Sequence, residues 1–158
     1  ELLRQGLWTG YLSTTSVYGD HHGAWVNEAS ETLVANQDPA PAARIKAEEG
    51  WLALADHGVH AQVFRLSGIY GPGRSMLDTI RKAKRPPVSS TAPQKFVSRI
   101  HVDDICQVVV ASMRAGSGSQ IFNVADDEPA PRAEVAAFAT KCAVKRSSCV
   151  VSASAGGW

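Results

Sequence analysis

The most informative part of the sequence is the stretch Leu12-Ser13-Thr14-Thr15-Ser16-Val17-Tyr18-Gly19-Asp20. It continues the apolar run Leu7-Trp8-Thr9-Gly10-Tyr11, and together they predict a buried parallel strand over Trp8 to Ser13. Ligands of open α/β sheets bind just beyond the carboxyl ends of the strands. We therefore expect the hydroxyl groups that follow this strand to polarise a substrate or to begin a proton relay. A strand that simply ends in a Ser/Thr loop is the alternative interpretation of this stretch taken alone.

Three later segments carry related patterns. Arg65-Leu66-Ser67-Gly68-Ile69-Tyr70-Gly71-Pro72-Gly73-Arg74 again combines a strand with a small polar residue, an aromatic residue and glycine. Arg99-Ile100-His101-Val102-Asp103-Asp104-Ile105 and Ile121-Phe122-Asn123-Val124-Ala125-Asp126-Asp127-Glu128-Pro129 follow it. Helices are predicted over residues 42–57, 76–84, 103–113 and 131–141. Strands that alternate with helices are typical of parallel βαβ units.

In this order, the four segments resemble the C-terminal half of the extended short-chain dehydrogenase/reductases, the NAD(P)-dependent epimerase/dehydratase family. The resemblance extends from about Leu7 to Phe138. It implies an α/β fold, with the C-terminal part of a Rossmann-like doubly wound parallel sheet and part of a small substrate lobe. Residues 1–144 would form this partial NAD(P)-binding domain. Residues 145–158, rich in Ser, Ala, Val and Gly, are expected to be an irregular tail.

The family's glycine-rich phosphate loop, of the type GxxGxxG, is missing from this sequence. That loop brings backbone N–H groups and a helix N-terminus to the cofactor pyrophosphate. Gly68, Gly71 and Gly73 follow a strand but adjoin an aromatic residue and a proline, so we interpret them as a turn. The chain begins at Glu1 without an initiator Met. We therefore expect a fragment that lacks the N-terminal cofactor half, and an incomplete site for NAD or NADP.

The resemblance also assigns the catalytic positions. Thr14 falls where family members carry the Ser/Thr hydroxyl that holds the substrate oxygen. The tyrosine of the family's Tyr-x-x-x-Lys motif is absent, because the two plausible registers place either Ala42 with Lys46 or Ala40 with Arg44 at these positions. A methyl group cannot carry out general acid–base catalysis. Tyr18 or Tyr70 could replace the missing phenol, although a tyrosine in such a turn is more often a packing residue.

These considerations give a set of predicted site residues. The predicted catalytic residues are Thr14 and Tyr18. The predicted cofactor contacts are Ser13, Arg44, Lys46, Ser67 and Gly68. The predicted substrate contacts are Thr15, Ser16, Tyr70, Arg74 and His101. For Arg44 and Lys46 the alternative is a solvated helix face, for Arg74 an exposed loop position, and for His101 a structural role at the start of a helix.

Composition restricts the possible partners. The 158 residues are 44% hydrophobic and 20% charged with a formal net charge of +1, as in an ordinary globular domain. This charge argues against nucleic-acid binding, which requires a concentrated basic face. No apolar run is long enough for a membrane span. The basic run at residues 81–85 is expected to end a helix.

The metal-binding and redox side chains form no recognisable motif. Cys106, Cys142 and Cys149 contain no CxxC pair, and their odd number fits a reducing compartment. Cys106 is expected in the core. Adjacent histidines such as His21 and His22 rarely bind one ion without further ligands. We therefore predict no metal site.

Two functional hypotheses follow. The first is an atypical NAD(P)-dependent epimerase/dehydratase-like protein that acts on a nucleotide sugar or a related small carbonyl or hydroxyl substrate. The second is a non-catalytic subunit with the same fold and a structural or nucleotide-sensing role in a larger assembly. Partners would be the small-molecule substrate and either a second copy or a larger protein assembly, since the alanine-rich helix face at Ala42, Ala43 and Ala47 permits a dimer.

Overall fold

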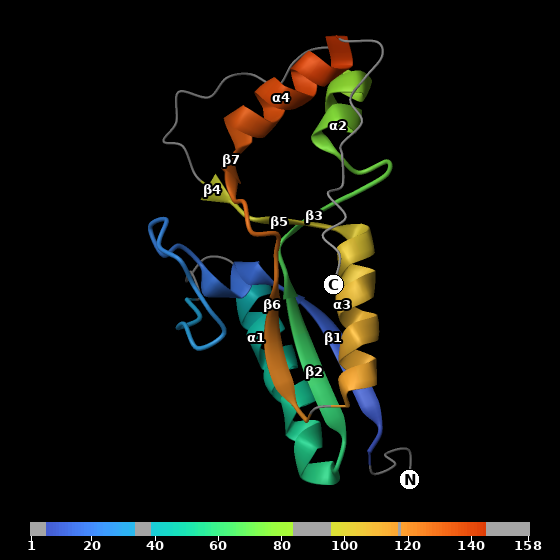
Figure 1. Ribbon diagram of the computed structural model, residues 1–158. Helices are drawn as coiled ribbons and strands as arrows, with labels where there is room; N and C mark the ends of the chain where they lie inside the picture. The colour runs from blue at the N-terminus through green and yellow to red at the C-terminus, as the bar shows by residue number, and fades with distance from the viewer. Residues whose placement is uncertain (1–5, 34–38, 84–95, 117, 145–158) are drawn as a thin grey trace.

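A three-stranded parallel sheet forms the centre of the protein. The computed structural model describes residues 6–33, 39–83, 96–116 and 118–144. The strands are β1 (Trp8–Thr14), β2 (His60–Leu66) and β6 (Gln120–Val124), in the order β1-β2-β6 (Figure 1). Leu66 is the register partner of both Thr14 and Val124. All three strands therefore end at the same edge of the sheet, as the sequence predicted.

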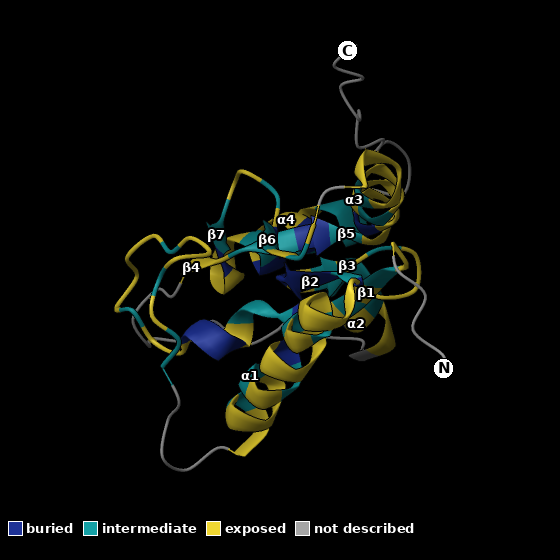
Figure 2. Cartoon of the chain, turned by 90° about the horizontal axis from the view of Figure 1, so that it is seen from below, coloured by how far each residue is buried: buried dark blue, intermediate teal, exposed yellow. Residues whose placement is uncertain are grey.

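The two faces of the sheet are covered by different helices. Helix α1 (Pro39–Leu52) lies on one face and α3 (Val102–Ala115) on the other (Figures 1 and 2). Strand β2 is central and is buried from residue 61 to residue 66. Because side chains alternate along a strand, Phe64 and Leu66 pack in the apolar cluster with α3, whereas Arg65 contacts α1. The face of the sheet that α1 covers therefore contains the buried charge of Arg65.

The apolar core lies between the sheet and α3. Its buried members are Phe64, Leu66, Ile100, Ile105 and Val124, and Trp8, Ile69, Val109 and Phe122 pack against them. The rings of Phe64 and Phe122 stack at 5.7 Å between centroids. Burial of these apolar side chains stabilises the packing of α3 on the sheet.

The helix boundaries follow the expected capping chemistry, with two differences. Helix α1 begins at Pro39 rather than Ala42, because proline suits the first helical position, where no N–H bond is lost. It continues into the 3₁₀ segment η2 (Ala53–His57) and ends at Gly58, whose φ is +75°. Helix α3 is capped by His101 rather than by the aspartates of its first turn, because the imidazole accepts a hydrogen bond from the amide of Asp103.

A smaller group of elements lies beyond the carboxyl ends of the large sheet (Figure 1). Strands β3 (Gly68–Tyr70) and β5 (Arg99–His101) are parallel, whereas β4 (Phe96–Val97) and β7 (Ala130–Pro131) are antiparallel. Helix α2 (Met76–Ala83) packs against α4 (Arg132–Val144). This arrangement confirms the predicted Rossmann-like α/β fold.

Some expectations were wrong or fall outside the described residues. Cys106 is exposed rather than in the core, because it lies on the outer side of α3. The predicted tail at residues 145–158 and the end of the basic run, residues 84–85, are outside the described residues. In the described part of the chain, no helix combines the length and the hydropathy needed to cross a membrane.

Candidate functional site

The hydroxyl cluster, defined as Thr14, Thr15 and Ser16, lies at the carboxyl end of β1. Thr14 is the N-cap of the 3₁₀ segment η1 (Thr15–Tyr18), and its Oγ1 accepts a hydrogen bond from the Ser16 amide at 3.2 Å. Because Oγ1 is the acceptor in this contact, its own proton remains available for donation to a ligand oxygen. Thr15 is half-buried and Ser16 is exposed. The cluster therefore offers hydroxyl groups at the edge where ligands bind in this fold class.

Ser67 faces the same edge from the neighbouring strand. It follows Leu66, the register partner of Thr14, and its amide donates to the carbonyl of Val124 at 3.0 Å. The side chain is 6% exposed, and its Oγ has no hydrogen-bond partner among the described residues. An unsatisfied buried hydroxyl costs free energy. The predicted proximity of Thr14 and Ser67, on adjacent parallel strands, is confirmed.

Ser13 and Tyr18, on either side of the hydroxyl cluster, are buried. The Ser13 hydroxyl donates to Glu48 Oε1 at 2.5 Å, so its side chain is engaged with α1. The Tyr18 hydroxyl donates to Asn123 Oδ1 at 2.7 Å and accepts from Arg65 Nη1 at 2.9 Å. Tyr18 is 2% exposed. In this arrangement its proton is already used, which favours packing over proton transfer.

A buried ion pair joins α1 to the central strand. Arg65 Nη2 lies 2.7 Å from Glu48 Oε2, and Nε donates to the same carboxylate. Burial alone would lower the pKa of Arg65, but the hydrogen bonds and charges of Glu48 and Tyr18 outweigh it and raise the pKa. This pair was not predicted from the sequence. The sequence does contain a sign of it, because Arg65 stands between Phe64 and Leu66 in an apolar strand. A charge that is buried in such a strand requires a partner of opposite charge.

The loop after η1 forms a hydrogen bond with β6, the edge strand on the opposite side of the sheet from β1. Glu28 Oε1 accepts a hydrogen bond from the backbone amide of Asn123 in β6 at 2.6 Å. His21 contacts the carbonyl of Glu31 through Nε2, and the amide of His22 donates to Asp20 Oδ1. These side chains have separate partners. Across the described residues no group of metal-ligating side chains converges.

Tyr70 and His101, both predicted substrate contacts, are register partners in the small parallel sheet. Their rings meet edge to face at 5.1 Å. His101 Nδ1 accepts from the Asp103 amide at 3.2 Å, which matches the structural alternative considered for it. Tyr70 is 38% exposed. Burial, together with the charges of Asp126 and Asp104, raises the pKa of Tyr70, so the phenolate that a general base requires forms less readily.

Arg44 and Lys46, the two predicted cofactor cations, are exposed on α1. Arg44 Nη1 donates to the hydroxyl of Tyr11 at 3.3 Å. Tyr11 precedes Thr14 by three residues on β1, so this contact lies about 10 Å from the carboxyl edge at the usual rise per residue. In this conformation the Arg44 side chain is directed to the middle of β1.

The glycines after β2 form a turn, as predicted, and not a phosphate loop. Gly71 and Arg74 exchange backbone hydrogen bonds across the turn, and the Arg74 side chain is exposed. The N-terminus of α2 is capped by Ser75, whose hydroxyl accepts from the amide of Asp78 and also contacts its carboxylate. That negative charge opposes anion binding there. Gly68, on β3, lies where an added Cβ would be 3.3 Å from the Ser98 carbonyl oxygen, so its lack of a side chain permits this approach.

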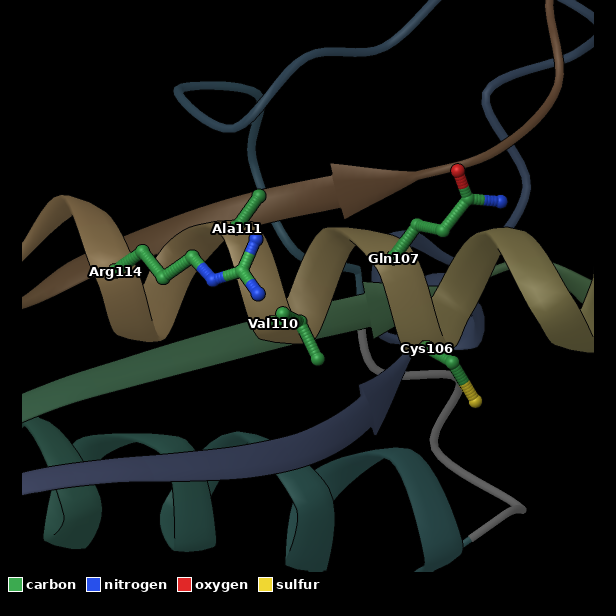
Figure 3. A pocket seen from close by; sticks show the side chains of 5 residues that line it. All are labelled: Cys106, Gln107, Val110, Ala111 and Arg114. Carbon is green, nitrogen blue, oxygen red and sulfur yellow. The ribbon is translucent and has the colours of Figure 1, made fainter.

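A hollow of about 430 Å³ lies elsewhere, along α3 (Figure 3). Its lining residues are Cys106, Gln107, Val110, Ala111 and Arg114. Figure 3 shows Cys106 and Val110 on one side of the helix and Gln107 and Ala111 on the other. The side chains do not converge on one point, whereas a ligand site needs convergent polar groups. The carboxyl edge of the sheet is therefore the better candidate site.

Comparison with known proteins shows the family of this chain. Residues 4–125 match the NAD dependent epimerase/dehydratase family. The chain belongs to this family. The match includes the hydroxyl cluster, the buried ion pair and Ser67, and it ends just after β6.

Individual relatives extend well beyond this chain. Protein YeeZ of Escherichia coli K12 is 28% identical over 116 residues, which are 72% of this chain and 38% of that protein. A solved structure of a protein of unknown function from Silicibacter pomeroyi is 39% identical, with a TM-score of 0.71 over 85% of this chain and 46% of that one. The chain thus spans less than half the length of these relatives.

The fold also matches a structure that was solved with NAD bound. The dTDP-glucose 4,6-dehydratase of Bacillus anthracis, in complex with NAD, is 21% identical with a TM-score of 0.67. The match covers 84% of this chain and 44% of that chain. This likeness supports the Rossmann-like fold assigned above.

Proposed function

We propose that this chain supplies the nicotinamide-facing and substrate-facing edge of an NAD(P)-dependent epimerase/dehydratase-like protein. Its substrate would be a nucleotide sugar or a related small molecule with a carbonyl or hydroxyl group. The observation that carries the proposal is the pair Thr14 and Ser67 at adjacent ends of parallel strands, where the buried Ser67 hydroxyl has no hydrogen-bond partner in the described part of the chain. Family membership and the NAD-bound relative support a nicotinamide cofactor.

The residues present fit the nicotinamide end of such a cofactor. Ser67 Oγ could bond a polar group of the nicotinamide ring or its ribose, and the Thr14 hydroxyl could donate to the substrate oxygen. The bound cofactor would supply hydride transfer. This chain's own part would be to bind, orient and polarise. Of the other predicted contacts, Thr15, Ser16, Gly68 and Arg74 remain candidates for substrate or cofactor binding because each is at least partly accessible.

Proton transfer is the step for which this chain offers the weakest candidates. The two alignment positions for the family phenol are Ala40 and Ala42. Tyr18 is buried with its hydroxyl in use, and the pKa of Tyr70 is raised. These observations favour the second candidate function, in which a non-catalytic member of the family binds a nucleotide for a structural or sensing role.

A binding experiment tests the shared part of both candidates. Thermal unfolding of the full-length protein is measured with NADH and with NADPH, because a ligand specific for the native state raises the melting temperature. We expect Ser67→Ala and Thr14→Val to reduce the ligand-induced shift. Thr9→Val is the matched control, since Thr9 lies on the same strand at the opposite end. Absence of a shift with either nucleotide would contradict the proposal.

A second experiment separates the two candidates. If the protein is an enzyme, a nucleotide sugar such as UDP-glucose or dTDP-glucose is converted to a new product when NAD or NADP is present, and the rate falls in Thr14→Val. Chromatography of the sugar measures this conversion, because an epimerase or dehydratase returns the hydride and leaves no net change in the cofactor. If it is a non-catalytic subunit, nucleotide binding persists without turnover for each sugar tested. Hydride transfer that is insensitive to Thr14→Val would remove Thr14 from its proposed role.

A further inference from the structure

We propose that Arg65 is the positioning residue of the hydroxyl cluster. Its guanidinium contacts the two residues that hold the flanks of the cluster. Nε and Nη2 donate to Glu48 Oε2 at 3.1 and 2.7 Å, and Nη1 donates to the Tyr18 hydroxyl at 2.9 Å. Glu48 in turn accepts from Ser13, directly before the cluster. Tyr18 is the last residue of η1, which contains the other two cluster residues.

Ser67 follows directly after the strand that carries Arg65. Arg65 is paired with Ser13 in the β1–β2 register and with Asn123 in the β2–β6 register. Asn123 accepts the proton of the Tyr18 hydroxyl, so the end of β6 joins the same network. The Arg65 side chain therefore joins both flanks of the hydroxyl cluster, and through Tyr18 the end of β6, to the strand that leads into Ser67. We infer that it sets the position of the Thr14 hydroxyl relative to Ser67.

The shape of the side chain matters as well as its charge. Arginine presents its donors as a rigid planar fork, whereas lysine is a single flexible cation. Here two edges of the fork point to different partners, the Glu48 carboxylate and the Tyr18 hydroxyl. The guanidinium carbon also lies 4.9 Å from the centroid of the Tyr18 ring. A lysine at this position could retain the charge pairing with Glu48 but could not hold both flanks.

Stability and positioning make different predictions for this network. Replacing a buried ion pair by apolar side chains of similar volume is often neutral for stability. If the pair only stabilises the fold, a replacement that preserves stability should leave the η1 backbone unchanged. If Arg65 positions the cluster, that backbone should loosen even when the fold is equally stable. The consequence for ligand binding rests on the proposed function, but the positioning itself does not.

The first experiment measures amide hydrogen exchange by NMR in the double variant Glu48→Met/Arg65→Met and in Arg65→Lys, without any nucleotide. The reporters are the amides of Ser16 and Gly19, which bond Thr14 Oγ1 and the Ser16 carbonyl. We expect their exchange to quicken about fivefold or more in both variants, as for a local opening made easier by a lost hydrogen bond. Amides of the β2–β6 ladder should keep their protection.

A single-atom variant provides a second test if the charge variants do not fold. Tyr18→Phe removes one hydroxyl and leaves the ion pair in place, so it should quicken the same two amides selectively. Tyr11→Phe is the control, because it removes a phenol that bonds only the exposed Arg44 in the contacts given above. An unchanged exchange rate in Tyr18→Phe, or an equal rise throughout the sheet, would overturn the proposal. A protein that binds no nucleotide could still show the selective effect, so this result is independent of the proposed function.

Discussion

At the scale of single residues, the least expected feature is that Glu48 is the buried residue of α1. It is 3% exposed and forms hydrogen bonds with Arg65 and Ser13. An amphipathic helix usually buries apolar side chains. Here α1 contacts the sheet through the Glu48 carboxylate, whose negative charge is paired with Arg65.

Removal of this carboxylate should therefore be costly. Glu48→Ala leaves the Arg65 guanidinium buried without its counter-charge, and we expect a loss of about 3–5 kcal/mol in the free energy of unfolding. Glu49→Ala, an exposed neighbour on the same helix, should change it by less than about 0.5 kcal/mol. Urea denaturation of both variants checks the difference. Equal effects would show that the ion pair adds nothing specific.

Asp126 gives a prediction about pH. Burial raises its pKa against the opposing effect of Arg99, and Oδ1 has no hydrogen-bond partner among the described residues. Between the usual aspartate pKa and the raised pKa of Asp126, the folded protein keeps a proton on this carboxyl group that the unfolded chain has released. The free energy of unfolding therefore falls as the pH rises through this window. Asp126→Asn should remove this fall. Urea titrations over pH 4 to 7 measure the free energy of unfolding of the wild type and of Asp126→Asn. The prediction is wrong if the wild type gains stability relative to Asp126→Asn as the pH rises through this window.

At the scale of elements, the segment from β1 to the following loop depends on one close backbone approach. Gly19 has φ +68° and ψ −145°, and an added Cβ would lie 2.5 Å from the Leu33 carbonyl oxygen. Only glycine adopts such a conformation readily. The amide of Leu33 also donates to the carbonyl of Tyr18, so the loop returns directly onto η1.

Two glycines of this loop make a matched comparison. Gly23→Ala should cost about 1 kcal/mol, since φ is +83° but the space around an added Cβ is open. Gly19→Ala adds a backbone clash to the strain and should cost at least about 1 kcal/mol more. Thermal or urea unfolding measures both. An equal loss of unfolding free energy in the two variants would show that the backbone at Leu33 moves away from the added methyl group at no cost.

The sequence predicted the periodic elements well and the polar network poorly. Strands β1, β2 and β6 could be located because apolar runs end in hydroxyl or acidic residues, and Gly58 marked the end of a helix. The partners of Arg65 could not be found, since Glu48 and Tyr18 come from separate elements whose contacts depend on tertiary packing. The cap of α3 was assigned to aspartates because carboxylates favour first turns, but His101 occupies the capping position. Cys106 was misplaced because its helix carries apolar residues on its exposed side too, including Val110 and Met113.

At the scale of the whole molecule, the two edges of the large sheet differ. At the β6 edge, the backbone amide of Asn123 donates a hydrogen bond to the Glu28 side chain. Strand β1 pairs only with β2 among the described residues. Its Leu12 side chain is 50% exposed at mid-strand. An open strand edge with exposed apolar side chains favours pairing with another chain or segment.

We therefore predict that this chain associates in a concentration-dependent way through β1. Leu12→Lys should shift the distribution toward monomer, because a charged edge opposes strand pairing. Phe138→Lys is the control, since Phe138 is 61% exposed but lies on α4. Sedimentation analysis at several concentrations measures the effect. A monomeric wild-type chain, or an equal response to both substitutions, would contradict this assignment of the interface.

We propose that the strand ends at Thr14 and Ser67 form a nicotinamide-facing edge, and NMR titration with nicotinamide mononucleotide is the sharpest test of this proposal. This probe carries the nicotinamide, ribose and one phosphate, so it does not require the pyrophosphate loop that the sequence lacks. We expect saturable shifts of the backbone amides of residues 14–16 and 67–68, and weaker binding in Ser67→Ala. Shifts confined to α3, or none at these five residues, would contradict it.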